Sequence, residues 1–137
     1  KSTLLAQNCG DLFLFEADIT FREPTRSFSI QLFEDEDKEE FFQFKLMPSE
    51  RHMIFERLPN EPWYQVMNIG LERPLQLTAG SIYHLQLVVD DTIATIYIDG
   101  ISMNVRVYDR PGSSLSVSVT DGAVEMHNAK LSRGICK

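Results

Sequence analysis

Apolar and polar side chains alternate along most of this chain, which is the pattern of a strand with one buried face. Between Leu12 and Phe21 the apolar odd positions are separated by Glu16, Asp18 and Thr20. Because successive side chains of a strand point to opposite faces, this period of two predicts a half-buried strand. Similar alternation predicts further strands at 27–32, 42–46, 51–56, 83–89, 92–98, 101–108, 115–119 and 123–131, with a short extended piece at 72–75.

The stretch from Tyr83 to Met103 gives the clearest structural signal. Apolar residues at 83, 85, 87 and 89 alternate with their neighbours, and Asp90-Asp91 is expected to turn the chain back. Asp99-Gly100 is a favoured two-residue hairpin turn, since these residue types adopt positive φ at low cost. This stretch therefore predicts consecutive antiparallel strands.

Turn residues recur about every ten residues, and no segment shows a sustained helical period of 3.6. About nine to eleven short strands with such turns indicate an all-β fold, either an antiparallel sandwich or a barrel. A chain of 137 residues matches the usual size of one domain, so we expect a single domain over 1–137. The acidic run 34–40 is expected to be a solvated turn and not a calcium loop, because it lacks the glycine and ligand spacing of an EF-hand.

Composition and charge exclude several classes of partner. The net charge is −7, from 20 acidic and 13 basic side chains. Nucleic acids are bound by Lys and Arg that neutralise phosphates, so we expect no nucleic-acid partner. No apolar run approaches the roughly 20 residues of a membrane helix, so no membrane partner is expected either. The opening Lys1-Ser2-Thr3 has no signal-peptide core, which is compatible with a piece of a longer protein.

The two cysteines, Cys9 and Cys136, lie near opposite ends of the sequence. A disulfide is expected if the first and last strands are neighbours in one sheet, because the Cα atoms must come within about 4.4–6.8 Å. The alternative is two unpaired thiols. Two cysteines without a neighbouring His or Cys do not form a zinc site, and we predict no metal and no cofactor.

The sequence is poorly supplied for catalysis. It contains no nucleophile elbow, no glycine-rich phosphate loop and no His-Glu-x-x-His motif. The histidines His52, His84 and His127 are scattered over predicted strands, where we expect them on solvent-facing sides. The chain by itself is therefore predicted not to be an enzyme.

Residues suited to sugar binding are better represented. Sugars are recognised by planar donors and acceptors on neighbouring hydroxyls, together with a flat aromatic surface. Glu72, Arg73, Arg106, Tyr108 and Trp63 supply these types. Cross-strand ion pairs are the alternative reading of the same arginines and acids.

Most of the chain also resembles a known family, the C-terminal β-sandwich of glycoside hydrolase family 32 enzymes, which act on fructans and sucrose. The resemblance is carried by Glu72-Arg73-Pro74-Leu75 and by the segments 15–20, 85–92, 94–100, 103–112 and 117–125. It implies a jelly-roll sandwich of the concanavalin or lectin-like type, similar to family 66 carbohydrate-binding modules. The family's catalytic acids lie in an N-terminal propeller, and its Asn-Asp-Pro-Asn motif is absent from this chain.

The resemblance implies a ligand and a partner. It implies a fructose pocket in which Glu72 accepts from hydroxyls, Arg73 and Arg106 donate, and Trp63 or Tyr108 packs on the sugar face. The expected function is a non-catalytic module that binds fructose units of levan or inulin beside a catalytic propeller. The alternative is a sandwich that only braces the propeller. An extracellular or cell-surface location is expected, with a cytoplasmic one as the alternative.

Overall fold

A computed structural model describes residues 2–6, 12–22, 25–35, 40–58, 72–107, 114–120 and 122–133. These residues form eleven β-strands and one short 3-10 turn, Pro48–Glu50. The strands are β1 (Ser2–Ala6), β2 (Leu12–Arg22), β3 (Ser27–Asp35), β4 (Glu40–Met47), β5 (His52–Leu58), β6 (Glu72–Pro74), β7 (Ile82–Asp90), β8 (Ile93–Ile98), β9 (Ile101–Arg106), β10 (Leu115–Thr120) and β11 (Ala123–Arg133). No helix in this described part is long and apolar enough to cross a membrane.

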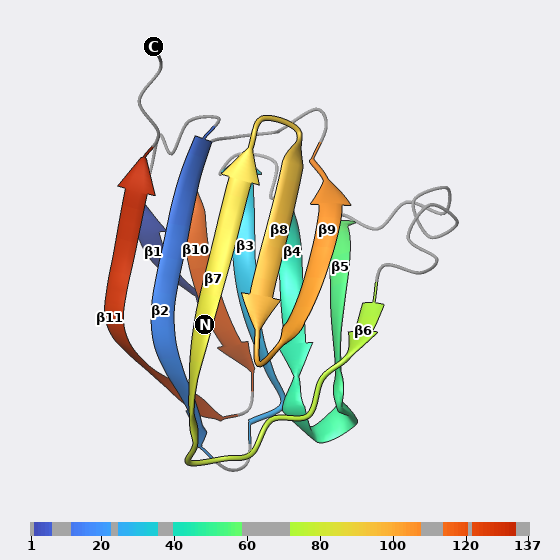
Figure 1. Cartoon of the computed structure of the whole chain (residues 1–137), viewed down its shortest axis with the longest axis vertical. Coiled ribbons are helices and arrows are strands. Elements are labelled where there is room, and N and C mark those ends of the chain that lie inside the picture. The colour runs from blue at the N-terminus through green and yellow to red at the C-terminus, as the bar shows by residue number, and fades with distance from the viewer. Residues whose placement is uncertain are drawn as a thin grey trace.

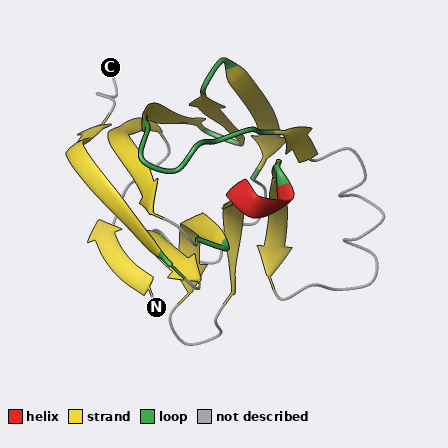
Figure 2. Cartoon of the chain, turned by 90° about the horizontal axis from the view of Figure 1, so that it is seen from below, coloured by secondary structure: helices red, strands yellow, loops and turns green. Residues whose placement is uncertain are grey.

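The strands form two antiparallel sheets packed face to face. The six-stranded sheet has the order β1-β10-β3-β4-β5-β6, and the five-stranded sheet has the order β11-β2-β7-β8-β9. Figure 1 shows the five-stranded sheet in front of the other, and Figure 2 shows the two layers from below, with the 3-10 turn in red. The predicted all-β antiparallel sandwich is confirmed.

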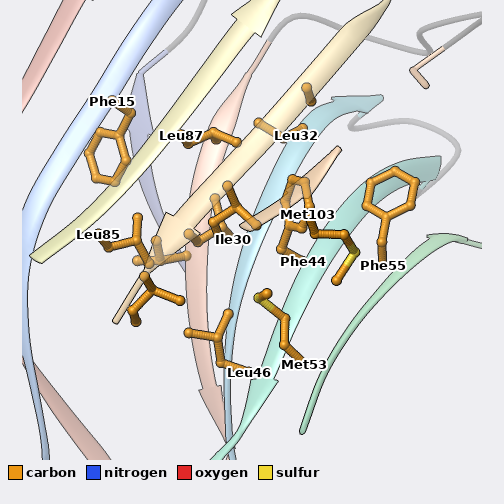
Figure 3. Close-up of a cluster of buried hydrophobic side chains, with 14 of the residues drawn as sticks. Phe15, Ile30, Leu32, Phe44, Leu46, Met53, Phe55, Leu85, Leu87 and Met103 are labelled. Carbon is orange, nitrogen blue, oxygen red and sulfur yellow. The ribbon is translucent and has the colours of Figure 1, made fainter. Parts of the chain in front are cut away.

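The core fills the space between the sheets. In β2 the odd positions from Phe13 to Phe21 are buried, as the alternation predicts. Figure 3 shows Leu85 and Leu87 of the five-stranded sheet in the same cluster as Ile30 and Phe44 of the six-stranded sheet. Edge-to-face ring pairs also join the two sheets, namely Phe13 with Phe33 and Phe21 with Phe28, with ring centroids 6.4 and 6.1 Å apart. Such pairs add about 0.5–1.5 kcal/mol to the burial of their surfaces.

The stretch from Tyr83 to Met103 forms the predicted run of antiparallel strands, β7-β8-β9. Asp99 and Gly100 both have positive φ, +49° and +75°, which is the geometry of a two-residue turn matched to the twist of its strands. Asp91, in the preceding turn, has φ of +55°. Aspartate tolerates this left-handed conformation better than most residues, which explains its place at both turns.

Some local features were not predicted. β1 was missed because Leu4-Leu5-Ala6 is a continuous apolar run without a period of two. The 3-10 turn begins at Pro48, whose fixed φ suits the first position of a helical turn, and Arg51 ends it with φ of +59°. Residues 36–39 of the acidic run lie outside the described residues, although its ends continue β3 and β4.

The first and last strands predicted from the sequence, 12–21 and 123–131, form β2 and β11. They are neighbours in the five-stranded sheet and pair as far as Phe13 with Arg133. The condition stated for a disulfide, neighbouring first and last predicted strands in one sheet, is therefore met. Cys9 and Cys136 both lie outside the described residues, so the two alternatives for their thiols stay predictions.

An ionisable cluster lies on the outer face of the five-stranded sheet. The imidazole of His84 on β7 lies between two carboxylates of β2, with Nδ1 2.8 Å from Asp18 Oδ1 and Nε2 3.1 Å from Glu16 Oε1. Asn128 on β11 donates to Asp18 Oδ2 at 2.9 Å. Both His84 and His127 are exposed on this face, as the sequence predicted.

These contacts shift two pKa values in opposite directions. The hydrogen bond to Asp18 is the largest effect and raises the pKa of His84; burial opposes it, and the bond to Glu16 raises the pKa further. Hydrogen bonds from Asn128 and then His84 lower the pKa of Asp18. The His84 contribution to stability is complete below its unfolded pKa of about 6.5 and is lost as pH rises through the folded pKa. The Asp18 contribution is lost as pH falls below about 3.9.

Truncation of the core should destabilise the fold strongly. Leu87 is fully buried, so Leu87→Ala removes apolar contacts and leaves a cavity, at an expected cost of about 2–5 kcal/mol in the free energy of unfolding. Urea denaturation would measure this change. Leu12→Ala is the matched control because Leu12 is 44% exposed, and it should change stability by about 0.5 kcal/mol or less. Equal costs for the two variants would contradict the assigned core.

The His84 cluster should make stability depend on pH. His84→Gln removes the charged imidazole, so the stability difference between wild type and variant should be larger at pH 5.5 than at pH 9. Urea denaturation at the two pH values measures this difference. In a background carrying Glu16→Gln and Asp18→Asn, the same substitution should lose its pH dependence, because the two acceptors no longer carry charge. A pH-independent effect of His84→Gln in the wild-type background would contradict the arrangement.

Candidate functional site

The predicted sugar-binding residues converge on two sheet edges. Glu72 and Arg73 lie on β6, the edge of the six-stranded sheet, and Arg106 ends β9, the edge of the five-stranded sheet. These two edge strands approach one another across the open side of the sandwich. Both appear on the right in Figure 1. Trp63 and Tyr108 lie outside the described residues.

The two arginines are placed on different faces. Arg73 is the register partner of Met53, which is fully buried, so Arg73 lies on the side of its sheet that faces the other sheet. Arg106 is exposed and is the register partner of Ile93 on the outer face of the five-stranded sheet. The fold therefore brings the arginines to neighbouring edges without bringing them to one face.

Glu72 is described only through its backbone. Its register partner is Ile54 on β5, two positions from Glu56. The roles assigned to Glu72, Arg73, Arg106, Tyr108 and Trp63 stay predictions, as does the alternative ion pair between Glu72 and Arg106.

A second group of polar side chains lies on the outer face of the six-stranded sheet. We call this group the polar face. It alternates with the core residues of four neighbouring strands and consists of Ser116 and Ser118 on β10, Ser29 and Gln31 on β3, Gln43 and Lys45 on β4, and Glu56 on β5.

Strand register places these side chains in rows. One row runs Ser116, Gln31, Gln43 and Glu56 across the four strands. The amide of Gln31 bonds both serines of β10: Ser116 Oγ donates to its Oε1 at 3.2 Å, and its Nε2 donates to Ser118 Oγ at 3.4 Å. Gln43 Nε2 donates to Glu56 Oε2 at 2.5 Å. The row therefore consists of two hydrogen-bonded groups side by side.

Sequence reasoning did not identify the polar face. Its serines and glutamines are the polar half of ordinary alternating strands, so no single residue stands out. The row depends on pairing between segments far apart in the chain, such as Gln31 with Ser116, which are 85 positions apart. The available signal was the choice of Gln and Ser, in place of Lys and Glu, at most polar positions of these strands.

A metal centre does not emerge from the described residues. They contain no group of three or more His, Cys, Asp and Glu side chains arranged to hold a metal ion. The His84 ring nitrogens are both engaged by carboxylates.

Comparisons with known proteins show the fold. No family model matches the sequence, and no curated protein matches it either. Among solved structures, the carbohydrate-binding module CBM66 from Bacillus subtilis matches with a TM-score of 0.69 and 16% identity, covering 89% of this chain and 75% of that chain. The Caenorhabditis elegans galectin LEC-6 matches with a TM-score of 0.68 and 14% identity, covering 97% and 90%.

A fructosyltransferase from A. japonicus matches with a TM-score of 0.71 and 17% identity. The match covers 99% of this chain but 24% of the enzyme, so the chain spans about a quarter of that protein's length. The resemblance to a family 32 C-terminal sandwich and to CBM66 is confirmed as a likeness of fold. The chain has the fold of carbohydrate-binding sandwich domains.

Proposed function

We propose that this chain is a non-catalytic carbohydrate-binding module that recognises fructose units of fructans such as levan and inulin. The observation that carries the proposal is the approach of β6 and β9, which brings the Glu72-Arg73 pair and Arg106 to neighbouring edges. These residues belong to segments whose sequence resembles fructan-active enzymes. The fold likeness to CBM66 and to a fructosyltransferase supports the same reading.

The chemistry of the two edges suits a neutral, hydroxyl-rich ligand. Arginine presents several N–H donors in a fixed plane, so two arginines on neighbouring edges can each donate to hydroxyl or ring oxygens. A carboxylate beside them accepts from hydroxyls, and an aromatic ring packs on the C–H side of a sugar. In the proposed site these roles belong to Arg73 and Arg106, to Glu72, and to Trp63 or Tyr108.

The module would act by holding an attached hydrolase near its polymer. We propose that the parent protein contains a catalytic propeller and that the module works where extracellular or cell-surface fructans occur, with a cytoplasmic location as the alternative. The net charge of −7 disfavours polyanionic ligands and is compatible with a neutral polysaccharide.

A second candidate function is a structural brace for that catalytic domain. The outer face of the five-stranded sheet exposes apolar side chains at one end, where Leu12 (44% exposed) and Ile93 (38% exposed) both pair in register with Asp90. Exposed apolar groups gathered at one place favour a protein contact. In this role the arginines at the sheet edges would serve as surface ion-pair partners.

Calorimetric titration separates these two functions. The folded chain should release or absorb heat with levan, inulin or free fructose, and Arg106→Ala should abolish binding while leaving the melting temperature nearly unchanged. Lys130→Ala is the matched control, since Lys130 is an exposed cation at the opposite edge of the same sheet, and it should bind like wild type. No heat from a folded chain with any of the three sugars would reject the module. A large fall in melting temperature for Arg106→Ala would favour the ion pair.

A further inference from the structure

The polar face combines burial with hydrogen-bonding capacity. Ser29, Gln43 and Ser116 are 4, 6 and 3% exposed, although they alternate with the core and lie on the outer side of the sheet. Burying polar groups is unfavourable unless they are hydrogen-bonded, so these side chains depend on their cross-strand hydrogen bonds. A face that binds a polar ligand needs such groups in fixed positions.

The two amides of the polar face are oriented before any ligand arrives. Gln31 is held by Ser116 and Ser118, and Gln43 is held by Glu56. A glutamine has two N–H donors and an acceptor oxygen, and within the described residues Gln43 uses one donor. The hydrogen bond between Gln43 and Glu56 holds the other polar atoms of these two side chains in place. This lowers the conformational entropy that is lost when a ligand binds.

One buried hydroxyl lies beside this face. The hydroxyl of Ser114 is buried and makes no hydrogen bond within the part of the chain that the structure describes. Ser114 precedes Ser116 and Ser118 in the same alternation, and its carbonyl accepts a hydrogen bond from Phe33 N at 2.7 Å. Leaving a buried hydroxyl unpaired is unfavourable, so a further polar partner at this end of the face would be favoured.

The charges and the apolar neighbours of the polar face select the class of ligand. Lys45 and Glu56 contribute one positive and one negative charge, so the described centre of the face is balanced. Phe41 is partly exposed on the same side of β4 as Gln43, and Ile54 is partly exposed beside Lys45. Fixed amides, balanced charge and a partly exposed aromatic ring match a neutral sugar better than an ionic ligand.

The polar face is continuous with the proposed fructose site. Lys45 pairs in register with Ile54, and Ile54 pairs with Glu72 on the edge strand β6. Four inter-strand steps separate β6 from β10, and at about 4.8 Å each the path is roughly 19 Å long. This path is longer than a single sugar ring.

We propose that the polar face binds the sugar units that follow the unit held at the β6 and β9 edges, so that the module contacts an extended segment of a neutral polysaccharide. Gln43 and Glu56 bind hydroxyls at the centre of the path, Phe41 packs on a ring, and Ser114 and Ser116 lie near its far end. The assignment to fructan rests on the proposed function. The assignment to a neutral glycan rests on the polar face alone.

Titration of the ¹⁵N-labelled chain, followed by NMR, tests the proposal. Free fructose should shift backbone amides of β6 and β9, whereas a short inulin-type oligosaccharide should also shift amides of β3, β4 and β5. Glu56→Gln keeps an oxygen that can accept from Gln43 and removes the charge. It should weaken oligosaccharide binding about tenfold, equivalent to about 1.4 kcal/mol, and leave fructose binding unchanged.

Two glutamine variants provide a second test of the polar face and a control for general surface effects. Gln43→Leu should weaken oligosaccharide binding like Glu56→Gln, because it removes the other half of the hydrogen-bonded pair. Gln86→Leu makes the same change on β7 of the five-stranded sheet and should bind like wild type. A Gln86→Leu variant that weakened binding as much as Gln43→Leu would overturn the assignment to the polar face.

A panel of neutral oligosaccharides built from glucose, galactose or mannose separates the two proposals. If fructans cause no shifts but one of these sugars shifts β3–β5 amides and loses affinity in Glu56→Gln, the fructan assignment is wrong and the glycan-binding face stands. If no neutral oligosaccharide shifts β3–β5 amides, the inference is overturned, whatever fructose does at β6 and β9.

Discussion

The structure depends on one constraint: each sheet has a single apolar face, and the two faces must cover each other. β2 shows this rule, with the odd positions from Phe13 to Phe21 directed inward and Glu16 and Asp18 directed outward. The rule also determines which side chains lie on the outer faces of the sheets. Once Phe42, Phe44 and Leu46 are directed inward, Phe41, Gln43 and Lys45 have to share the outer face of β4, and the polar face follows from the packing of the core.

Much of the fold could be predicted because its signals are local. The alternation in β2, the turn at Asp99-Gly100 and the antiparallel order of β7, β8 and β9 are each contained within about twenty residues of sequence. β1 was missed for the opposite reason: a short apolar run without alternation carries no period. Its strand identity depends on pairing with β10, near the other end of the chain.

The candidate site was less accessible from the sequence because it depends on long-range pairing. Residue types alone suggested that Glu72, Arg73 and Arg106 act together, but not that β6 and β9 belong to different sheets. The register partner Met53 shows on which face of its sheet Arg73 lies, and Ile93 does the same for Arg106. The faces of the two arginines could therefore be assigned only once the strand register was known. The same holds for Gln31, which meets Ser116 only because β3 and β10 are neighbours.

The order of strands in the sheets has a consequence for how the chain reaches its native state. β2 pairs with β11, and the contact of Asp18 with Asn128 joins residues 110 positions apart. Both sheets therefore need strands from the two ends of the sequence, and neither can be completed until nearly all of the chain is available. A topology dominated by such distant contacts folds slowly, typically in milliseconds to seconds. Until β11 and β10 pair with them, β2 and β3 each keep one edge unpaired. During synthesis, β10 and β11 are the segments that end this exposure.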